Sequence, residues 1–470
     1  MIRDRDRSSP RVFLRLLLFL VGLGLAFLLL TTFWTGAAPR VTAKPRLPGI
    51  GARTPIDLRL DDTGRVSRLA VDLIQGADVH PILERRFTTR PGWKFWQKAV
   101  PAEITAEVGR QTVRGLRAGQ ATVRVTAERP GSLLRRPAPV VVELVLPVRL
   151  APPSLAVLST FHYAAQGGAE AVVFRVSDGT AVSGVWAGAW WFPSYPLGKD
   201  PKERFSLFGI PYDMTDGSAI RLVGQDDIGN RTEVAFIDKF TPRPIKTDTI
   251  EVDDAFVARV VPEILQNSPE VADQGDPIKS YLAINRELRK KNNQTLKELA
   301  AHSAPRFLWN EPFLPMHNAA IMAHFADRRT YLYKGQPIDQ QDHLGFDMAS
   351  VEHAPIQAAN RGVVVLARYF GIFGNAVVLD HGYGLMTLYG HLSSIGVKEG
   401  QEVARGQEIG RSGKTGLAGG DHLHFTALLH GLPVNPVEWW DPKWITDRIV
   451  RKLGAPLAPG APAAQATPAT

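Results

Sequence analysis

The chain of 470 residues contains only 12 histidines, and several of them form short patterns that could bind a metal ion. In the pattern His343-x-x-x-Asp347, an extended strand would place the imidazole and the carboxylate on the same side. In His422-x-His424, the two imidazoles would likewise share one strand face. A further histidine, His391, stands between an apolar strand and a glycine-rich turn. Imidazole nitrogen and carboxylate oxygen are common zinc ligands, so these patterns predict a Zn²⁺ site.

Two histidines and one carboxylate are a typical catalytic zinc set, which leaves a fourth position for water. Zinc can lower the pKa of that water to about 7 and can polarise a scissile carbonyl group. Such a site also needs groups that move a proton and stabilise a developing oxyanion, and imidazole can do either near neutral pH. With three ligands assigned, two of the four histidines named above bind the metal and two remain for these roles.

Three other histidines of the region lack a partner pattern. His353 and His381 are expected to be structural or exposed, and His430 is expected to lie in a turn with Gly431. We therefore leave them out of the predicted site.

The elements that must position the site are glycine-rich strands from Tyr331 onward. Upstream of them, two helices are predicted over Asp253–Gln266 and Pro277–Ala301, because apolar residues recur there with helical spacing. Asp276 can cap the second helix, and Pro277 suits its first turn. This segment is expected to be either an ordered packing helix or a spacer arm.

Two regions before these helices have the pattern of β-domains. From Thr54 to about Leu150, apolar residues alternate with polar ones between turns rich in Gly, Asp and Pro, which predicts an antiparallel β-sandwich. A second β-rich stretch reaches about Ile245. Its expected strands are Ala171–Val176, Val185–Phe192, Phe205–Ile210, Ile220–Val223 and Glu233–Ile237, the last two paired across the turn 226–230.

The segment Leu16–Trp34 carries no charge and is long enough, as a helix, to cross a bilayer core of about 30 Å. Arginines precede it and should stay in the cytoplasm, so everything after Trp34 would be exported. We interpret it as an uncleaved single-pass anchor in the cytoplasmic membrane, with the C-terminal domains in the periplasm or outside the cell. The alternative is a signal peptide cleaved near Gly36-Ala37-Ala38.

The composition is that of a globular protein, with a formal net charge of +9 and no cysteine. The absence of cysteine excludes disulfides, cysteine-ligated metals and a cysteine nucleophile. Part of the positive charge is the arginine cluster of the N-terminus, so we interpret the charge first as an indication of membrane topology. We therefore expect no nucleic-acid partner.

Taken together, the motifs resemble those of the lysostaphin/LytM-type zinc metallopeptidases. The resemblance covers about Pro315 to Trp440 and rests on His343-Leu-Gly-Phe-Asp347, Tyr389-Gly-His391-Leu and His422-Leu-His424-Phe in this order. It implies that His343, Asp347 and His424 bind zinc, and that His391 and His422 act on the water and the oxyanion. Asp421 departs from the family pattern, in which a proline or a small residue is expected.

The resemblance further implies an enzyme that hydrolyses peptide bonds in peptidoglycan stems or cross-links, with an open antiparallel β-sheet and a groove over the metal. Some relatives have lost their ligands and only activate cell-wall amidases, so a non-catalytic envelope module is the main alternative. A zinc peptidase that acts on a protein substrate is another. The β-domains could bind envelope protein partners.

The expected fold class is mainly β and multidomain, with a transmembrane helix, two β-sandwich-like domains, a short helical segment and a C-terminal open antiparallel β-sheet domain. The expected boundaries are 1–15 (cytoplasmic basic segment), 16–35 (anchor), 49–150 (β-sandwich-like), 151–246 (second β-domain), 250–310 (helical linker), 315–445 (zinc peptidase) and 454–470 (disordered tail rich in Pro and Ala).

Overall fold

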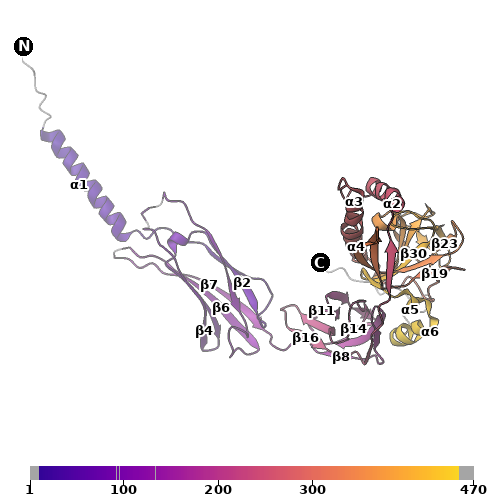
Figure 1. Cartoon of the computed structure of the whole chain (residues 1–470). Coiled ribbons are helices and arrows are strands. Elements are labelled where there is room, and N and C mark those ends of the chain that lie inside the picture. Colours follow the sequence, from indigo (N-terminus) through magenta and orange to yellow (C-terminus); the bar gives the residue numbers. More distant parts are fainter. Residues whose placement is uncertain (1–9, 92, 95, 133, 455–470) are drawn as a thin grey trace, which may run out of the picture. The chain divides into compact units, whose positions relative to one another are not determined.

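The computed structural model describes residues 10–91, 93–94, 96–132 and 134–454. Most of the expected cytoplasmic basic segment and nearly all of the expected tail lie outside these residues. By its internal contacts the chain divides into two compact units, Met1–Pro152 with Gln225–Arg231, and Pro153–Gly224 with Thr232–Thr470. Figure 1 labels their elements, and the mainly β fold class is confirmed.

The first unit begins with helix α1 (Pro10–Phe33), whose stretch Val12–Phe33 is apolar and long enough to cross a membrane. Apart from its last turn, where Thr32 is buried, this stretch is not buried inside the protein. Its apolar side chains therefore face outward, as a membrane-spanning or signal segment requires and a core helix does not.

Two antiparallel sheets form the rest of the first unit. Their inner faces carry the alternating apolar residues that the sequence predicts, such as Ile56, Leu58 and Leu60 from one sheet and Val123 and Val125 from the other. The first sheet has the order β1-β2-β5, with β1 Val41–Pro45, β2 Thr54–Leu60 and β5 Ala102–Val108. The second has the order β4-β3-β6-β7, with β3 Arg68–Gln75, β4 Asp78–Arg86, β6 Gly119–Glu128 and β7 Val140–Val148.

The second unit starts with further β-structure. The expected strand over Val185–Phe192 is wrong, because the chain turns at Gly188 (φ +60°) and Val185 pairs with Phe192 in a hairpin. The sheets have the orders β13-β14-β10-β8, β12-β11-β15-β16 and β17-β9. The strands are β8 Leu155–Val157, β9 Tyr163–Ala165, β10 Ala169–Val176, β11 Thr180–Ala187, β12 Trp190–Pro193, β13 Tyr195–Leu197, β14 Asp200–Gly209, β15 Ile220–Asp226, β16 Arg231–Val234 and β17 Lys239–Thr241.

The helices α2 (Asp254–Asn267), α3 (Pro277–Ala283) and α4 (Arg289–Ala300) follow, with a π-helical turn over Ile284–Leu288 between the last two. Both helical starts are capped by aspartate: Asp253 accepts from the amide of Phe256 (2.7 Å), and Asp276 accepts from the amide of Lys279 (2.8 Å). The capping role predicted for Asp276 is confirmed.

The C-terminal sheet has the order β19-β22-β30-β26-β25-β24-β28, with β31 paired to β30. Its strands are β19 Ala320–Ala323, β22 Phe346–Ala349, β24 Gly362–Tyr369, β25 Asn375–Gly382, β26 Leu385–Leu392, β28 Glu402–Val403, β30 Leu423–Leu429 and β31 Leu432–Val434. Two three-stranded sheets flank it: β18 (Thr247–Glu251), β20 (Asp327–Tyr333) and β21 (Gln336–His343), and β23 (Pro355–Gln357), β29 (Glu408–Arg411) and β27 (Ser394–Ile395). The last helices are α5 Pro436–Trp440, α6 Pro442–Ile445 and α7 Arg451–Leu453, with a π-helical turn over Thr446–Val450.

Both faces of this C-terminal sheet are buried, and nearly every residue of β25, β26 and β30 is therefore buried. One face packs on the second β region and α5, in a core that includes Leu423 and Phe425. The other packs on the helices, in a core that joins Leu428 to Ile284 and Leu288. The helical segment 250–310, expected to be a linker, therefore shares a hydrophobic core with the sheet.

Candidate metal centre

Three donor atoms converge at the edge of the C-terminal sheet. Nε2 of His343 lies 2.9 Å from Oδ1 of Asp347 and 3.1 Å from Nδ1 of His424, and the last two atoms are 2.9 Å apart. All three side chains are buried. Ligands of a tetrahedral zinc ion lie about 3.3 Å from one another, given bonds of about 2.0–2.1 Å. The three atoms therefore have nearly the spacing of one face of such a site.

The local fold explains why these side chains meet. His343 ends β21, whereas Asp347 lies in β22, where it pairs directly with His424 of β30. The expectation that His343 and Asp347 share one extended strand is wrong, because the chain turns at Leu344-Gly345 and passes between two sheets. Only glycine fits this turn, since a Cβ on Gly345 would lie 2.6 Å from the His424 ring.

Hydrogen bonds on the far side of each ring fix the imidazole tautomers. Nδ1 of His343 donates to the carbonyl of His324 (3.0 Å), so Nε2 carries a lone pair in the neutral ring. Thr426 donates its hydroxyl to the carbonyl of Leu344 (3.1 Å) and so accepts from Nε2 of His424 (3.0 Å). Nδ1 of His424 then also carries a lone pair. Two imidazole lone pairs and a carboxylate oxygen point at one place, which suits a cation.

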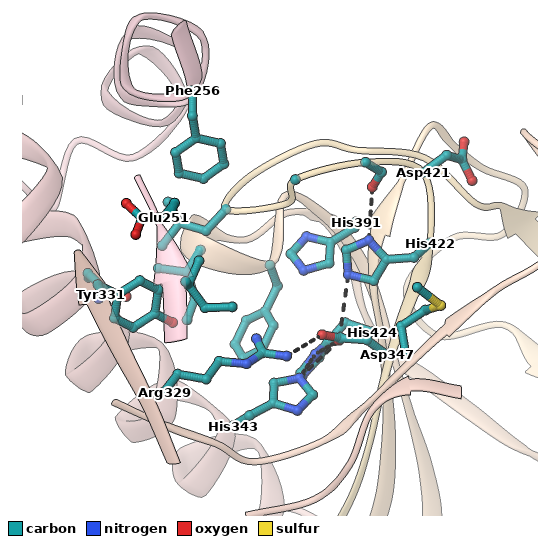
Figure 2. Close-up of a pocket in the computed structure, with 18 of the residues that line it drawn as sticks. Glu251, Phe256, Arg329, Tyr331, His343, Asp347, His391, Asp421, His422 and His424 are labelled. Atoms are coloured by element: carbon teal, nitrogen blue, oxygen red, sulfur yellow. Dashed lines mark hydrogen bonds and ion pairs between the residues drawn. The ribbon is translucent and has the colours of Figure 1, made fainter. Parts of the chain in front are cut away.

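The charges of the site agree with this geometry. Burial would raise the pKa of Asp347, but its interactions with His343, and after it with His422 and His424, outweigh burial and hold this pKa well below its usual range. Burial lowers the pKa of His424 to about 4. Ionised carboxylate and neutral imidazole are the forms that bind metal. Arg329 donates to Oδ2 of Asp347 (2.8 Å), which leaves Oδ1 for the metal (Figure 2).

His391 and His422 lie beside the three donors, with their ring centroids 4.8 Å apart. Nδ1 of His391 donates to the carbonyl of Thr415 (2.8 Å), and Nδ1 of His422 donates to that of Gly420 (2.9 Å). In the neutral rings Nε2 is then the acceptor nitrogen, and Nε2 of His422 lies 3.5 Å from Oδ1 of Asp347. Burial lowers the pKa of His391 well below its usual range. Burial acts on His422 too, but the carboxylate of Asp347, 3.5 Å away, raises its pKa.

A β-bulge in β26 brings His391 to this side of the sheet. Tyr389 packs on Phe425 in the opposite core, and strand alternation alone would send His391 the same way. Tyr389 pairs with Val377 and Leu392 pairs with Asn375, so this part of β26 has one residue more than the facing part of β25. His391 lies there with φ +63°. The extra residue re-aims the imidazole toward the donors, as bulges beside active sites commonly do.

A cavity of about 530 Å³ lies over the donors, and Figure 2 shows the residues that line it. Glu251, at the end of β18, and Phe256 of α2 lie on one side together with Tyr331. His391 and His422 lie on the other side, next to the glycine-rich loop at 419–420. An extended peptide could enter from this open cavity and reach the metal position.

Helix α2 also holds the loop that fixes His391. Arg259 donates to the carbonyls of Lys414 (3.2 Å) and Ala418 (2.5 Å), and Glu263 accepts from the amide of Gly416 (2.9 Å). These contacts flank Thr415, whose carbonyl receives the His391 proton. The two side chains of α2 therefore position His391 without touching it.

We expect Arg259→Ala to lower kcat by about tenfold or more, because small misplacements of a catalytic group are costly. Zinc content should not change, since the three donors keep their own partners. Gln266→Ala, at an exposed position of the same helix, is the control and should behave like the unaltered protein. The measurement is kcat and KM on a peptide substrate, together with the zinc content. Unchanged kcat in Arg259→Ala would refute the positioning role.

The other residues weighed from the sequence lie outside the centre. His381 is fully buried between the carbonyl of Arg361 and Thr387, and His430 lies in a turn, so both are structural. His353 is exposed. Asp421 turns away from the donors and accepts from the Ser412 hydroxyl (2.5 Å), so this departure from the family pattern ties two loops together.

Sequence reasoning missed the supporting partners Arg329, Thr426 and the carbonyls of His324 and Thr415. Arg329 lies 14 residues before His343, and no spacing rule connects them. Only the pairing of β20 with β21 brings it to the site. Two of the other partners are backbone carbonyls, which any residue type would supply.

The comparisons with known proteins agree with this centre. Residues 341–436 match Peptidase family M23. The chain is 34% identical over 171 residues to the peptidoglycan DD-endopeptidase ShyA of Vibrio cholerae, an alignment that covers 36% of each protein. It is 43% identical over 95 residues to the DD-carboxypeptidase/endopeptidase Mpg of Neisseria meningitidis, covering 20% of this chain and 22% of Mpg. This chain thus spans about a third or less of these relatives.

Among solved structures, the catalytic domain of the antimicrobial peptidase lysostaphin from Staphylococcus simulans is 27% identical, with a TM-score of 0.23, and the match covers 26% of this chain and 92% of that one. The resemblance seen in the sequence is confirmed by the family match. The chain contains a peptidase family M23 domain.

Proposed function

We propose that the chain is a zinc-dependent endopeptidase that hydrolyses peptide bonds in peptidoglycan stems or cross-links. The observation that carries this proposal is the convergence of two imidazole lone pairs and an ionised carboxylate beside two further histidines, each held at Nδ1 by a backbone carbonyl. The names of ShyA and Mpg, which are peptidoglycan DD-endopeptidase and DD-carboxypeptidase/endopeptidase, support the substrate class.

In this proposal His343, Asp347 and His424 hold the zinc. When bound, zinc would polarise the scissile carbonyl and make a water molecule more acidic. One of His391 and His422 takes the proton of the attacking water at Nε2, and the other, once protonated, donates to the developing oxyanion. Arg329 keeps Asp347 ionised and fixed while charge develops beside it.

The site of action is proposed to be the cell envelope. Helix α1 would anchor the chain in the cytoplasmic membrane, with the peptidase domain on the outer side, where peptidoglycan lies. Removal of α1 as a signal sequence would leave the same domain in the same compartment.

The proposal is tested with the purified full-length protein in detergent. We expect one zinc per chain and the release of shortened or uncross-linked muropeptides from isolated sacculi, both lost after treatment with a chelator. Casein is the control substrate and should stay intact. Stoichiometric zinc without any muropeptide release would overturn the proposal in favour of a non-catalytic activator, and cleavage of casein alone would indicate a protein substrate.

A further inference from the structure

One end of the N-terminal β-sandwich combines the end of helix α1 with two long loops. Arg68 of β3 pairs with Arg86 of β4 and with Glu128 of β6. The loops that follow β4 and β6, over residues 87–101 and 129–139, therefore leave the same end of the sheet. Residues 92, 95 and 133 within them are outside the described part of the chain.

These loops bind the end of α1. The carbonyl of Thr32 accepts from the Ser132 hydroxyl (2.5 Å) and from the amide of Leu134 (3.3 Å). Carbonyls in the last turn of a helix have no partner within the helix, and in a membrane an unpaired carbonyl is costly. Arg129 also donates to the carbonyl of Gly36 (2.8 Å). The loops thus hold the helix end at a fixed place.

The loop 87–101 also reaches down the side of α1. Trp93 packs edge-on against Phe27, with ring centroids 5.5 Å apart, and against Trp96. Phe27 lies six residues before the helix end at Phe33, which is about 9 Å along the axis at about 1.5 Å per residue. If α1 spans the bilayer, Trp93 must lie below the level of the helix end, where tryptophan side chains concentrate in membrane proteins.

The exposed side chains of this end suit a bilayer surface. Trp96, Val100 and Leu134 are exposed large apolar side chains. By sequence, the two loops contain no acidic residue and six cationic ones. Arg90 is paired with the buried Asp62, and the others are Lys94, Lys98, Arg129, Arg135 and Arg136. Lys94 lies over the Trp93 ring (5.3 Å). Apolar and aromatic side chains among cations are typical of surfaces that enter the headgroup region.

The opposite end of the sandwich differs. Its loop 109–118 also carries arginines, but the large apolar residues Val113 and Leu116 of this loop are buried, and Val79 beside the neighbouring hairpin turn is a single exposed apolar side chain. Positive charge alone therefore does not distinguish the two ends. The two ends are distinguished by the group of exposed apolar side chains that lies beside helix α1.

We propose that the described residues of the loops 87–101 and 129–139 insert into the headgroup region of the outer face of the membrane that α1 spans. The sandwich then contacts the bilayer at three places, the helix and both loops. It therefore does not reorient freely relative to the membrane. This inference rests on the proposed membrane anchoring of α1 and is independent of the peptidase activity.

The test uses the full chain in vesicles of mixed neutral and anionic phospholipids. Because the chain has no cysteine, single cysteines can carry an environment-sensitive fluorophore. Leu134→Cys reports on the loop, Val79→Cys on the opposite end of the sandwich and Leu20→Cys on α1. The three native side chains are similarly exposed, at 70%, 56% and 55%. Quenching is measured with iodide in the water and with nitroxide-labelled lipid in the bilayer.

We expect the Leu134 label to be quenched by the lipid and protected from iodide several-fold relative to the Val79 label, with blue-shifted emission. The Leu20 label should be quenched by the lipid alone. The inference is overturned, and the anchor stays intact, if the Leu20 label lies in lipid but iodide quenches the Leu134 label as strongly as the Val79 label. Protection from iodide without lipid quenching would indicate shielding by protein and would also overturn it. A Leu20 label in water would remove both the anchor and the inference.

Discussion

Replacing Asp347 by alanine is expected to abolish zinc binding and peptidase activity together. Among the residues that the structure describes, its Oδ1 is the only carboxylate oxygen of the three converging donors, and it lies 2.9 Å from a nitrogen of His343 and of His424. Without it, two neutral imidazoles remain, and they bind zinc too weakly to hold it through purification. The same loss is expected for His343→Ala and His424→Ala. Zinc content is measured on the purified variants, and activity is measured as muropeptide release from sacculi.

The Asp347 variant needs a control for folding, because Arg329 would lose its buried partner. Breaking a buried ion pair by removing one member costs about 3–5 kcal/mol. Asp347→Asn keeps the shape and the hydrogen bond from Arg329, and it should retain the thermal unfolding of the parent more closely while still losing zinc. His353→Ala, at an exposed histidine outside the centre, should keep both zinc and activity. Stoichiometric zinc in a folded Asp347→Asn protein would contradict the ligand assignment.

Removing the Thr426 hydroxyl is expected to weaken zinc binding without abolishing it. Its hydroxyl accepts from Nε2 of His424 and holds the ring so that Nδ1 faces the metal position. Partners of this kind typically contribute 10–100-fold to metal affinity or activity, about 1–3 kcal/mol. The proposed ligand His424 therefore depends for its orientation on a residue two positions further along the same strand face.

The sequence predicts the elements better than their contacts. Alternation in β2, β5 and β6 follows directly from burying one face of each strand, so the sandwich can be recognised residue by residue. The helix starts were predictable because aspartate caps act within one turn. The packing of the helices on the sheet could not be predicted from the sequence, because the sheet face that they contact lies on β24–β26, about a hundred residues further on.

The candidate site shows the same division. Residue types and spacing pointed to the two motifs that contain His343, Asp347 and His424, and the family resemblance assigned these three as ligands. The argument from one shared strand was nevertheless wrong for His343 and Asp347. For His422 and His424 it was sound: His422 forms a β-bridge with Gly413 directly before β30, His424 lies in β30, and both side chains face the cavity. His391 reaches the groove only through a bulge, whose position depends on the partner strand β25. Such register shifts leave no periodic signal in one sequence.

Replacing His391 or His422 by glutamine is expected to leave zinc content unchanged and to lower kcat by at least about 100-fold, the usual range for a general acid or base. Neither ring contributes to the three converging donor atoms, and each is held by its own carbonyl, at Thr415 or Gly420. Glutamine can occupy the position and form hydrogen bonds, but it cannot carry a proton between water and product.

The separation of zinc binding from turnover distinguishes these two histidines from the ligands. KM should change little if the variants still bind the peptide, so the loss should appear in kcat. His302→Ala, an exposed histidine beyond the end of α4, is the matched control and should have the kcat of the parent. Loss of zinc from His422→Gln would place Nε2 of His422 among the ligands. Because His422 and His424 lie on the same strand face only two residues apart, this measurement decides which of them holds the metal.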